Sequence, residues 1–90
     1  MELSLVIPIY NEEQNLPLLM DAINAALKPL QKTWEVVFVD DGSRDRSLEV
    51  LRTFAQKTPE HVRVVSFRRN FGQTAAIAAG IDHARGDIIV

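Results

Sequence analysis

Short apolar runs alternate along this chain with segments in which apolar residues recur at helical spacing. The runs at residues 3–10, 34–39 and 62–67 are dominated by apolar, often branched, side chains. Runs of this kind are typical of strands that are buried on both faces, as the strands of parallel sheets are. The segments between and after the runs carry an apolar residue every three or four positions, which predicts amphipathic helices. The pattern therefore predicts an alternation of strands and helices.

The ends of the first two expected helices are marked by polar residues and proline. The first helix would follow Asn15 as its amino-terminal cap, and Pro29 would end or bend it. The second helix would begin near Asp45 and stop at Thr58 and Pro59. The apolar positions expected to face the core are Leu16, Leu19, Met20, Ile23, Leu27 and Leu30 in the first helix, and Leu48, Leu51, Phe54 and Ala55 in the second.

A third helix, rich in small residues, is predicted over residues 72–85, with Gly86 as its stop. Its small side chains would let it lie close against the sheet; they are Ala75, Ala76, Ala78, Ala79 and Gly80. Residues 87–90 would then begin a fourth strand that is cut off by the end of the chain. Strands that alternate with helices at this spacing imply right-handed crossovers and a mostly parallel, Rossmann-like sheet. We therefore expect an α/β fold in which residues 1–90 form a single, incomplete domain.

Composition excludes several classes of protein. The 90 residues are 47% hydrophobic and 24% charged, with a formal net charge of -2, which describes an ordinary globular chain. Near-neutral charge without a basic stripe argues against nucleic acid as a partner. Because there is no cysteine, the chain has neither a disulfide framework nor a thiolate zinc site, and a cytoplasmic location is compatible. The apolar run at residues 3–10 fits neither a signal peptide nor a membrane span.

The loops after the first two strands form the candidate site, because ligands of open parallel sheets bind beyond the carboxyl ends of the strands. The first of these loops, residues 8–13, has two carboxylates and no glycine. It cannot cradle a bare diphosphate as a glycine-rich loop does, which disfavours a Rossmann dehydrogenase or a P-loop enzyme. The second loop adds Asp40 and Asp41. Carboxylates of this kind can accept hydrogen bonds from ribose hydroxyls and from an N–H of the base. A divalent cation bound elsewhere would screen the charge of the diphosphate.

Two motifs carry a resemblance to a known family. The sequence VIPIYNE at residues 6–12, followed by VDDGS at residues 39–43, resembles the opening of family 2 glycosyltransferases, which have the GT-A fold. The sequences RNFGQ at residues 69–73 and ARGD at residues 84–87 resemble the polyprenyl-phosphate branch of that family. This branch includes dolichol-phosphate mannose synthases and bactoprenol glucosyltransferases. The resemblance covers essentially the whole chain and implies the nucleotide-binding half of a GT-A domain, with strand order 3-2-1-4 and helices on both faces of the sheet.

The resemblance also implies an activity and a set of binding residues. Members of this branch transfer a sugar from a nucleoside diphosphate sugar to a lipid phosphate, here a polyprenyl or dolichyl phosphate. The positions that match the nucleoside-binding residues of the family are Pro8, Tyr10, Glu12 and Asp41, with Asp40 as a weaker candidate. Tyr10 would lie against the base. Uracil and guanine both fit these motifs.

The family holds a magnesium or manganese ion on an Asp-x-Asp motif that follows the fourth strand, and the sequence ends at Val90 before such a motif. By resemblance the metal ligands and the acceptor side therefore lie beyond residue 90, and no catalytic or metal-binding residue is assigned within the chain. We expect the isolated chain to lack transferase activity. We also expect low stability or self-association through a poorly protected sheet edge, and, for the complete protein, a place at the cytoplasmic face of the membrane.

Two other functions compete with this interpretation. A signalling receiver domain also places acidic residues at strand ends to bind magnesium, but its acidic pair follows the first strand, whereas Asp40 and Asp41 follow the second. A catalytically inactive nucleotide-binding or assembly module is the main alternative for the isolated chain. Asp40 and Asp41 are in addition common turn formers.

Several polar residues have a simpler structural explanation. Glu13 suits the start of a helix, where the helix dipole favours a carboxylate. Arg68 and Arg69 would be a solvated surface or would face a phosphate. His61 and His83 have no second ligand at metal spacing, and both are expected at the surface.

Overall fold

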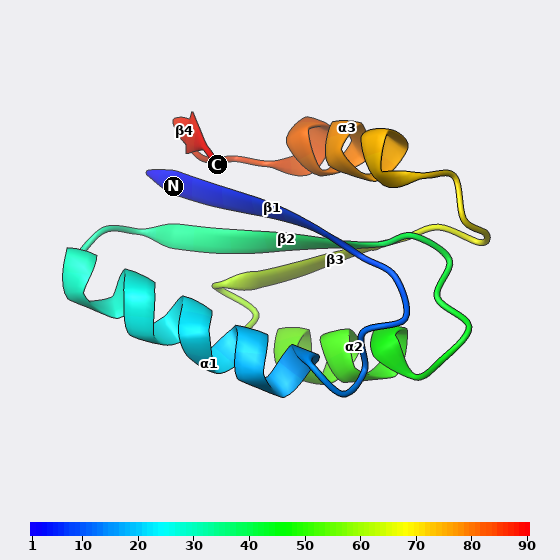
Figure 1. The fold of residues 1–90 in the computed structure, drawn as a ribbon. Coiled ribbons are helices and arrows are strands. Elements are labelled where there is room, and N and C mark those ends of the chain that lie inside the picture. Colours follow the sequence, from blue (N-terminus) through cyan, green and yellow to red (C-terminus); the bar gives the residue numbers. More distant parts are fainter.

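A computed structural model describes all residues 1–90 and contains one parallel four-stranded sheet. The strand order is β3-β2-β1-β4, as predicted (Figure 1). In chain order the elements are β1 (Leu3–Ile9), α1 (Leu16–Leu27), a short 3-10 helix η1 (Lys28–Leu30), β2 (Trp34–Asp40), α2 (Ser47–Lys57), β3 (Val62–Ser66), α3 (Gln73–His83) and β4 (Ile88–Ile89).

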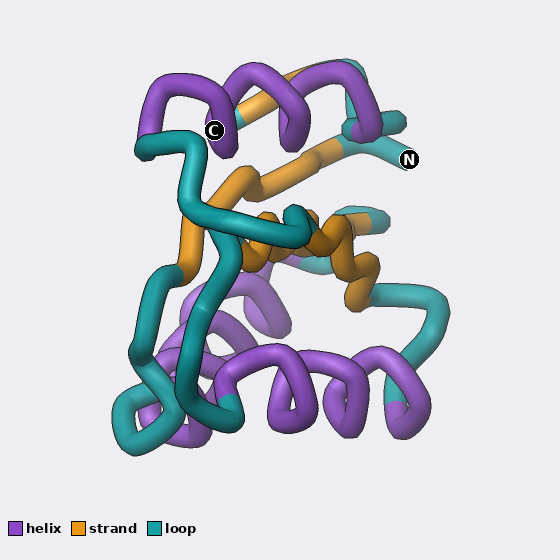
Figure 2. The backbone as a smooth tube through the Cα atoms, turned by 90° about the vertical axis from the view of Figure 1, so that its right-hand side faces the viewer, coloured by secondary structure: helices purple, strands orange, loops and turns teal.

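Helices cover both faces of the sheet, which confirms the expected layering. Helices α1 and α2 lie on one face and α3 lies on the other, so that the sheet is seen edge-on between two helical layers (Figures 1 and 2). All seven residues of β2 are buried, because this strand has a neighbour on each side and helices above and below. The larger part of the core, on the side of α1 and α2, comprises Ile9, Leu16, Met20, Ile23, Leu27, Trp34, Val36, Phe38, Leu51 and Val62.

Helix α3 lies unusually close to the sheet because its inner face consists of small residues. Ala76 is fully buried against Val37 and Val39. A Cβ atom added to Gly80 would lie only 2.2 Å from Cγ1 of Val6, a distance that real Cβ atoms do not show. The prediction that small residues let this helix approach the sheet is confirmed.

Three features of the helix ends differ from the prediction, and the first two concern α1. Asn15 makes no capping hydrogen bond. Its backbone is already helical, with φ -91° and ψ -17°, whereas a capping side chain normally reaches the helix from an extended backbone. At the other end α1 stops at Leu27 and gives way to η1, which contains Pro29, so the prediction that this proline ends or bends the helix is confirmed. Leu30, however, is 50% exposed rather than part of the core.

The third difference is at the end of α3. This helix ends at His83, before the predicted limit at residue 85. Gly86 is not its stop but part of the connection to β4, where a Cβ atom would come within 2.6 Å of the backbone nitrogen of Ser4. The fourth strand pairs in parallel with Leu3 and Ser4 of β1. None of the helices combines the length and the apolar character needed to cross a bilayer.

Candidate nucleotide site

The carboxyl ends of β1 and β2 bring most of the predicted binding residues into one cavity. The two strands are paired from Leu3 opposite Trp34 to Ile9 opposite Asp40, so the loops that follow them start side by side. A cavity of about 330 Å³ opens there, lined by Pro8, Ile9, Tyr10, Glu12, Asp41, Asn70, Gly72 and Gln73. Four of the five predicted residues line it, and Asp40 is the one that does not.

Asp41 is the most constrained residue of this cavity. Its side chain is buried, and its carboxylate accepts three hydrogen bonds from the segment that follows β3. Oδ1 accepts the backbone N–H of Phe71 at 2.8 Å, and Oδ2 accepts the backbone N–H of Gly72 at 3.1 Å. Oδ2 also accepts Nδ2 of Asn70 at 3.1 Å, and the same amide donates to the backbone oxygen of Asp41 at 3.2 Å. Asp41 thereby holds residues 70–72 as one wall of the cavity.

The close approach of these two loops requires a glycine. Gly42, with φ +71°, lies against the backbone of the segment after β3, and a Cβ atom there would be 2.2 Å from the carbonyl carbon of Arg69. A residue with a side chain would be strained by its left-handed conformation and would also push the segment away. Gly42 therefore lets Asp41 reach its three donors.

Asp40 has a structural role in the turn. It is 2% exposed, and its Oδ2 accepts the backbone N–H of Ser43 at 3.3 Å. Its Oδ1 is buried without a hydrogen-bond partner. The interpretation of Asp40 as a turn former is therefore supported by this geometry, whereas Asp41 has partners beyond the turn.

The loop after β1 is tied to the loop after β2 by hydrogen bonds. Asn11, in the left-handed conformation with φ 53°, donates its backbone N–H to Oγ of Ser43 at 2.9 Å, and its own Oδ1 accepts the N–H of Arg44 at 2.8 Å. The backbone N–H of Glu12 donates to Oγ of Ser47 at 2.8 Å. These bonds fix the backbone of Glu12 while its exposed carboxylate stays in reach of a ligand. Asn11 was not among the predicted binding residues, although it stands in the first motif, VIPIYNE.

The amino terminus of α2 is held by Asp45. Its Oδ1 accepts the N–H of Ser47 at 2.9 Å, and its Oδ2 accepts the N–H of Glu13 at 3.3 Å. The hydrogen bond from Ser47 lowers the pKa of the Asp45 carboxyl below its ordinary value. Glu13 contributes its backbone to this joint, which agrees with the structural role expected for it.

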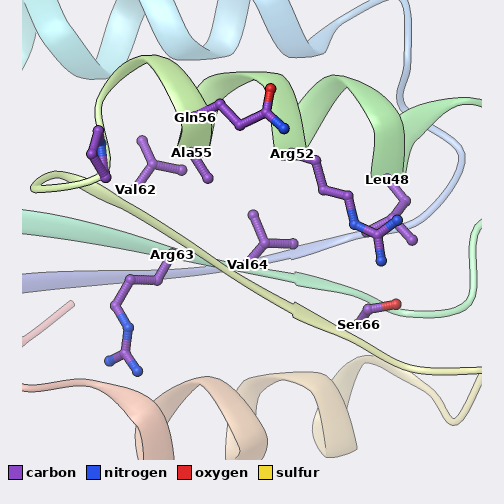
Figure 3. Close-up of a pocket in the computed structure, with 9 residues that line it drawn as sticks. Leu48, Arg52, Ala55, Gln56, Val62, Arg63, Val64 and Ser66 are labelled. Carbon is purple, nitrogen blue, oxygen red and sulfur yellow. The ribbon is translucent and has the colours of Figure 1, made fainter.

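A larger groove lies on the outer side of β3. It has a volume of about 510 Å³ and runs between α2 and this edge strand (Figure 3). Its charged lining residues are Arg52 and Arg63, and the side chain of Arg63 points away from α2 toward α3 (Figure 3). The groove contains none of the predicted binding residues, because those lie at the strand ends rather than along the edge.

Comparison with known proteins decides the family. The family model described as "Glycosyl transferase family 2" matches residues 4–90. The chain belongs to glycosyltransferase family 2.

The relatives of this family 2 chain include lipid-phosphate sugar transferases. It is 46% identical over 87 residues to an undecaprenyl-phosphate 4-deoxy-4-formamido-L-arabinose transferase of Pectobacterium atrosepticum. The aligned region covers 97% of the chain and 27% of that protein. It is 47% identical over 87 residues to the transferase of the same name from Pseudomonas fluorescens, with 97% and 26% coverage. The chain thus spans about a quarter of the length of these relatives, and the predicted resemblance to the polyprenyl-phosphate branch is confirmed.

Solved structures confirm the fold of the family 2 chain. A structure of Staphylococcus aureus TarS, residues 1–349, superposes with a TM-score of 0.80 at 25% identity and covers 100% of the chain and 27% of that protein. The mannosyltransferase PcManGT of Pyrobaculum calidifontis, in complex with GDP-Man and Mn2+, superposes with a TM-score of 0.77 at 25% identity. It covers 98% of the chain and 26% of that protein. The GT-A-like arrangement predicted from the sequence is therefore confirmed.

At the other end of the sheet, this family 2 chain buries a carboxylate that the sequence did not single out. Glu35 is fully buried in β2, and its carboxylate accepts Oγ of Ser4 at 2.6 Å and the backbone N–H of Arg85 at 2.7 Å. Its Oε1 lies 3.3 Å from Nη2 of Arg85 and 3.8 Å from Nη1 of Arg63. Ser4 in turn accepts the backbone N–H of Gly86 at 2.8 Å. The lone acidic residue inside an apolar run was the signal that could have revealed this cluster.

The pKa of Glu35 reflects two opposing effects. Burial raises the pKa of this carboxyl, but the hydrogen bonds from Ser4 and Arg85 and the positive charge of Arg85 outweigh burial. The pKa therefore lies below its ordinary value, and the group stays ionised at neutral pH. The cluster joins β1 and β2 to the connection between α3 and β4.

The remaining candidates lie outside the cavity. Arg68 and Arg69 are exposed and do not line it, and the guanidinium of Arg69 lies over the ring of Phe71, 4.6 Å from its centroid. The expectation for His61 is corrected: it is half-buried, because its ring stacks on Trp34, with the two centroids 4.1 Å apart, and its Nδ1 lies 2.8 Å from the backbone oxygen of Trp34. No group of three or more His, Asp or Glu side chains in residues 1–90 is placed to hold a metal ion.

Proposed function

We propose that this chain is the nucleoside-binding part of an enzyme that transfers a sugar from a nucleoside diphosphate sugar to a polyprenyl phosphate. The observation that carries the proposal is that Pro8, Tyr10, Glu12 and Asp41 line one cavity at the carboxyl ends of β1 and β2. Ligands of open parallel sheets bind at this end of the strands. The names of the relatives, which are undecaprenyl-phosphate sugar transferases, support the reaction and the acceptor.

Each lining residue has a role that its chemistry allows. Asp41 accepts a base N–H, because its carboxylate is buried and held in place by three donors. Glu12, whose carboxylate is exposed at the rim, accepts ribose hydroxyls. Tyr10 is 42% exposed and presents its ring to the base, while Pro8 closes the wall formed by β1. Asp40 supports the turn that presents Asp41.

A divalent cation belongs to the reaction of the complete enzyme. Magnesium or manganese would neutralise the diphosphate as it leaves and so favour direct attack by the lipid phosphate on the sugar. The mannosyltransferase structure that resembles this chain holds Mn2+ together with GDP-Man, which supports this assignment. We place the ligands of the metal outside residues 1–90 and the complete enzyme at the cytoplasmic face of the membrane. The contribution of residues 1–90 is to bind and orient the nucleoside.

Replacing Asp41 by asparagine tests the proposal by calorimetry with UDP and with GDP. Loss of the charged acceptor should weaken binding of the cognate nucleotide by about 1–3 kcal/mol. Asp21→Asn is the matched control, because Asp21 is exposed on α1 and does not line the cavity. The affinity of this variant should equal that of the unchanged protein. Unchanged affinity in Asp41→Asn would remove Asp41 from the site. Binding without any sugar transfer in the complete protein would favour the alternative, a non-catalytic nucleotide-binding module.

A further inference from the structure

The hydrogen bonds of Asp41 leave it with a limited capacity for a ligand. An ionised carboxylate has two oxygens and about four lone-pair positions. The N–H of Phe71 occupies one position on Oδ1, at 2.8 Å. The N–H of Gly72 and Nδ2 of Asn70 occupy both positions on Oδ2, each at 3.1 Å. One lone pair therefore remains, and it belongs to Oδ1.

Of the three donors to Asp41, only that of Asn70 belongs to a side chain. It is therefore the only donor that an amino-acid substitution removes directly. Its amide is oriented unambiguously, because Nδ2 faces two acceptors, the backbone oxygen of Asp41 at 3.2 Å and Oδ2 of the same residue. Asn70 itself lines the cavity. Because Nδ2 of Asn70 is already engaged by Asp41, this amide nitrogen affects a ligand through the lone pair that it occupies on Asp41.

The two candidate bases place different demands on a carboxylate. Uracil offers one N–H, at N3, which lies between two carbonyl oxygens. Guanine offers two adjacent donors, at N1 and at the exocyclic amine, and a carboxylate pairs with both only if each of its oxygens has a free lone pair. With Oδ2 already saturated, the exocyclic amine of guanine would be buried without its acceptor, which is a costly arrangement.

We propose that Asn70 is a specificity-determining residue that, by saturating Oδ2 of Asp41, selects a uracil nucleotide over a guanine nucleotide. This inference rests on the proposed function, because it requires Asp41 to contact the base. Asn70 acts as a positioning residue: it limits and orients Asp41 rather than forming the base contact. In Asn70→Ala each oxygen of Asp41 would have one free lone pair, which is the arrangement that guanine needs.

The test compares the affinities of UDP and GDP by calorimetry in the unchanged protein, in Asn70→Ala and in the control Asn24→Ala. Asn24 is exposed on α1, so its loss repeats the chemical change away from the cavity. The unchanged protein and the control should bind UDP at least about tenfold more tightly than GDP. In Asn70→Ala this ratio should fall by about tenfold, mainly through tighter binding of GDP. A merely structural role of Asn70 would weaken both nucleotides alike and leave the ratio unchanged.

Each outcome has a defined meaning. Equal affinity for the two nucleotides, or a preference for GDP, in the unchanged protein overturns the inference and leaves the proposed function standing. The same holds if the ratio is unchanged in Asn70→Ala while its thermal unfolding matches that of the unchanged protein. Binding of neither nucleotide would overturn the proposed function and the inference with it. If Asn70→Ala does not fold, the unchanged protein can still overturn the inference, because equal affinity for UDP and GDP would contradict it.

Discussion

Replacing Glu35 by glutamine measures how much the fold depends on the carboxylate buried beneath the connection between α3 and β4. Oγ of Ser4 and the backbone N–H of Arg85 both donate to Oε2, so a glutamine oxygen in that position can still accept both hydrogen bonds, while its amide faces the guanidinium of Arg85. What the variant loses is the negative charge that faces Nη2 of Arg85 at 3.3 Å and Nη1 of Arg63 at 3.8 Å. These two side chains are 56% and 34% exposed, so water screens part of the interaction.

The screening decides the size of the expected effect. Breaking a fully buried ion pair costs about 3–5 kcal/mol, whereas an exposed pair contributes less than about 1 kcal/mol. With one partner fully buried and two partly solvated, we expect Glu35→Gln to lower the free energy of unfolding by about 1–3 kcal/mol at neutral pH. In a domain of this size each kcal/mol corresponds to a change in Tm of about 4–8 °C.

The effect should depend on pH in a direction set by the lowered pKa of Glu35. A carboxyl whose pKa is lower in the folded state stabilises the fold fully above its unfolded pKa and loses this contribution as the pH falls through the folded value. The ordinary value is 4.5, and burial, which raises the pKa, is outweighed by the bonds from Ser4 and Arg85. The difference between Glu35→Gln and the unchanged protein should therefore be largest at neutral pH and should narrow below about pH 4.5.

Urea unfolding followed by circular dichroism, at about pH 7 and about pH 3, measures both quantities. Glu49→Gln is the matched control, because Glu49 pairs with Arg46 at 2.9 Å on the surface, with side chains 65% and 74% exposed. Its effect should stay within about 0.5 kcal/mol. Equal losses of stability in the two variants, or a loss in Glu35→Gln that is as large at acid pH as at neutral pH, would show that the charge of Glu35 does not stabilise the fold.

Two other predictions concern α3 and the edge of the sheet. Gly80→Ala should lower the free energy of unfolding by about 1–2 kcal/mol in thermal or urea unfolding, because its Cβ would meet Cγ1 of Val6; a stabilisation, as helix propensity alone would give, contradicts the close packing. The chain should self-associate or unfold readily, because Ile88, Ile89 and Val90 are 62%, 42% and 71% exposed at a short sheet edge. Sedimentation equilibrium tests this, and a stable monomer at high concentration would show the prediction to be wrong.

The order of elements could be predicted from the sequence because the signal for each is local. The run around Phe38 has the composition of a strand buried on both faces, and the helical spacing that includes Leu16 and Leu51 predicts which faces pack against it. Parallel strands joined by helices then leave few possible topologies. The meeting of Tyr10 and Asp41 at one edge follows from the same rule, so most of the candidate site could be placed before its geometry was known.

What the sequence did not reveal depends on backbone groups and on contacts between distant residues. The donors to Asp41 include the backbone N–H groups of Phe71 and Gly72, 30 and 31 residues further along the chain. Because almost every residue has a backbone N–H, the sequence does not show which of these groups donates to Asp41. Glu35 looked like an interruption of an apolar run, and only the pairing of β1 with β2 places it beside Ser4. The missing cap at Asn15 has a similar origin, since its amide donates to Oε2 of Glu12 instead, at 2.8 Å.

A nucleotide that binds in the cavity at the ends of β1 and β2 should change the environment of the backbone amides around it. The most direct test records the 1H–15N chemical shifts of the chain while UDP is added. The shifts of Tyr10, Asp41 and Gly72 should change together and saturate with one dissociation constant. The shifts of Ala55 and Val64, in the larger groove beside β3, should not change. Changes confined to that groove, or an unaltered spectrum at saturating UDP and GDP, would show that the nucleotide does not bind in the cavity.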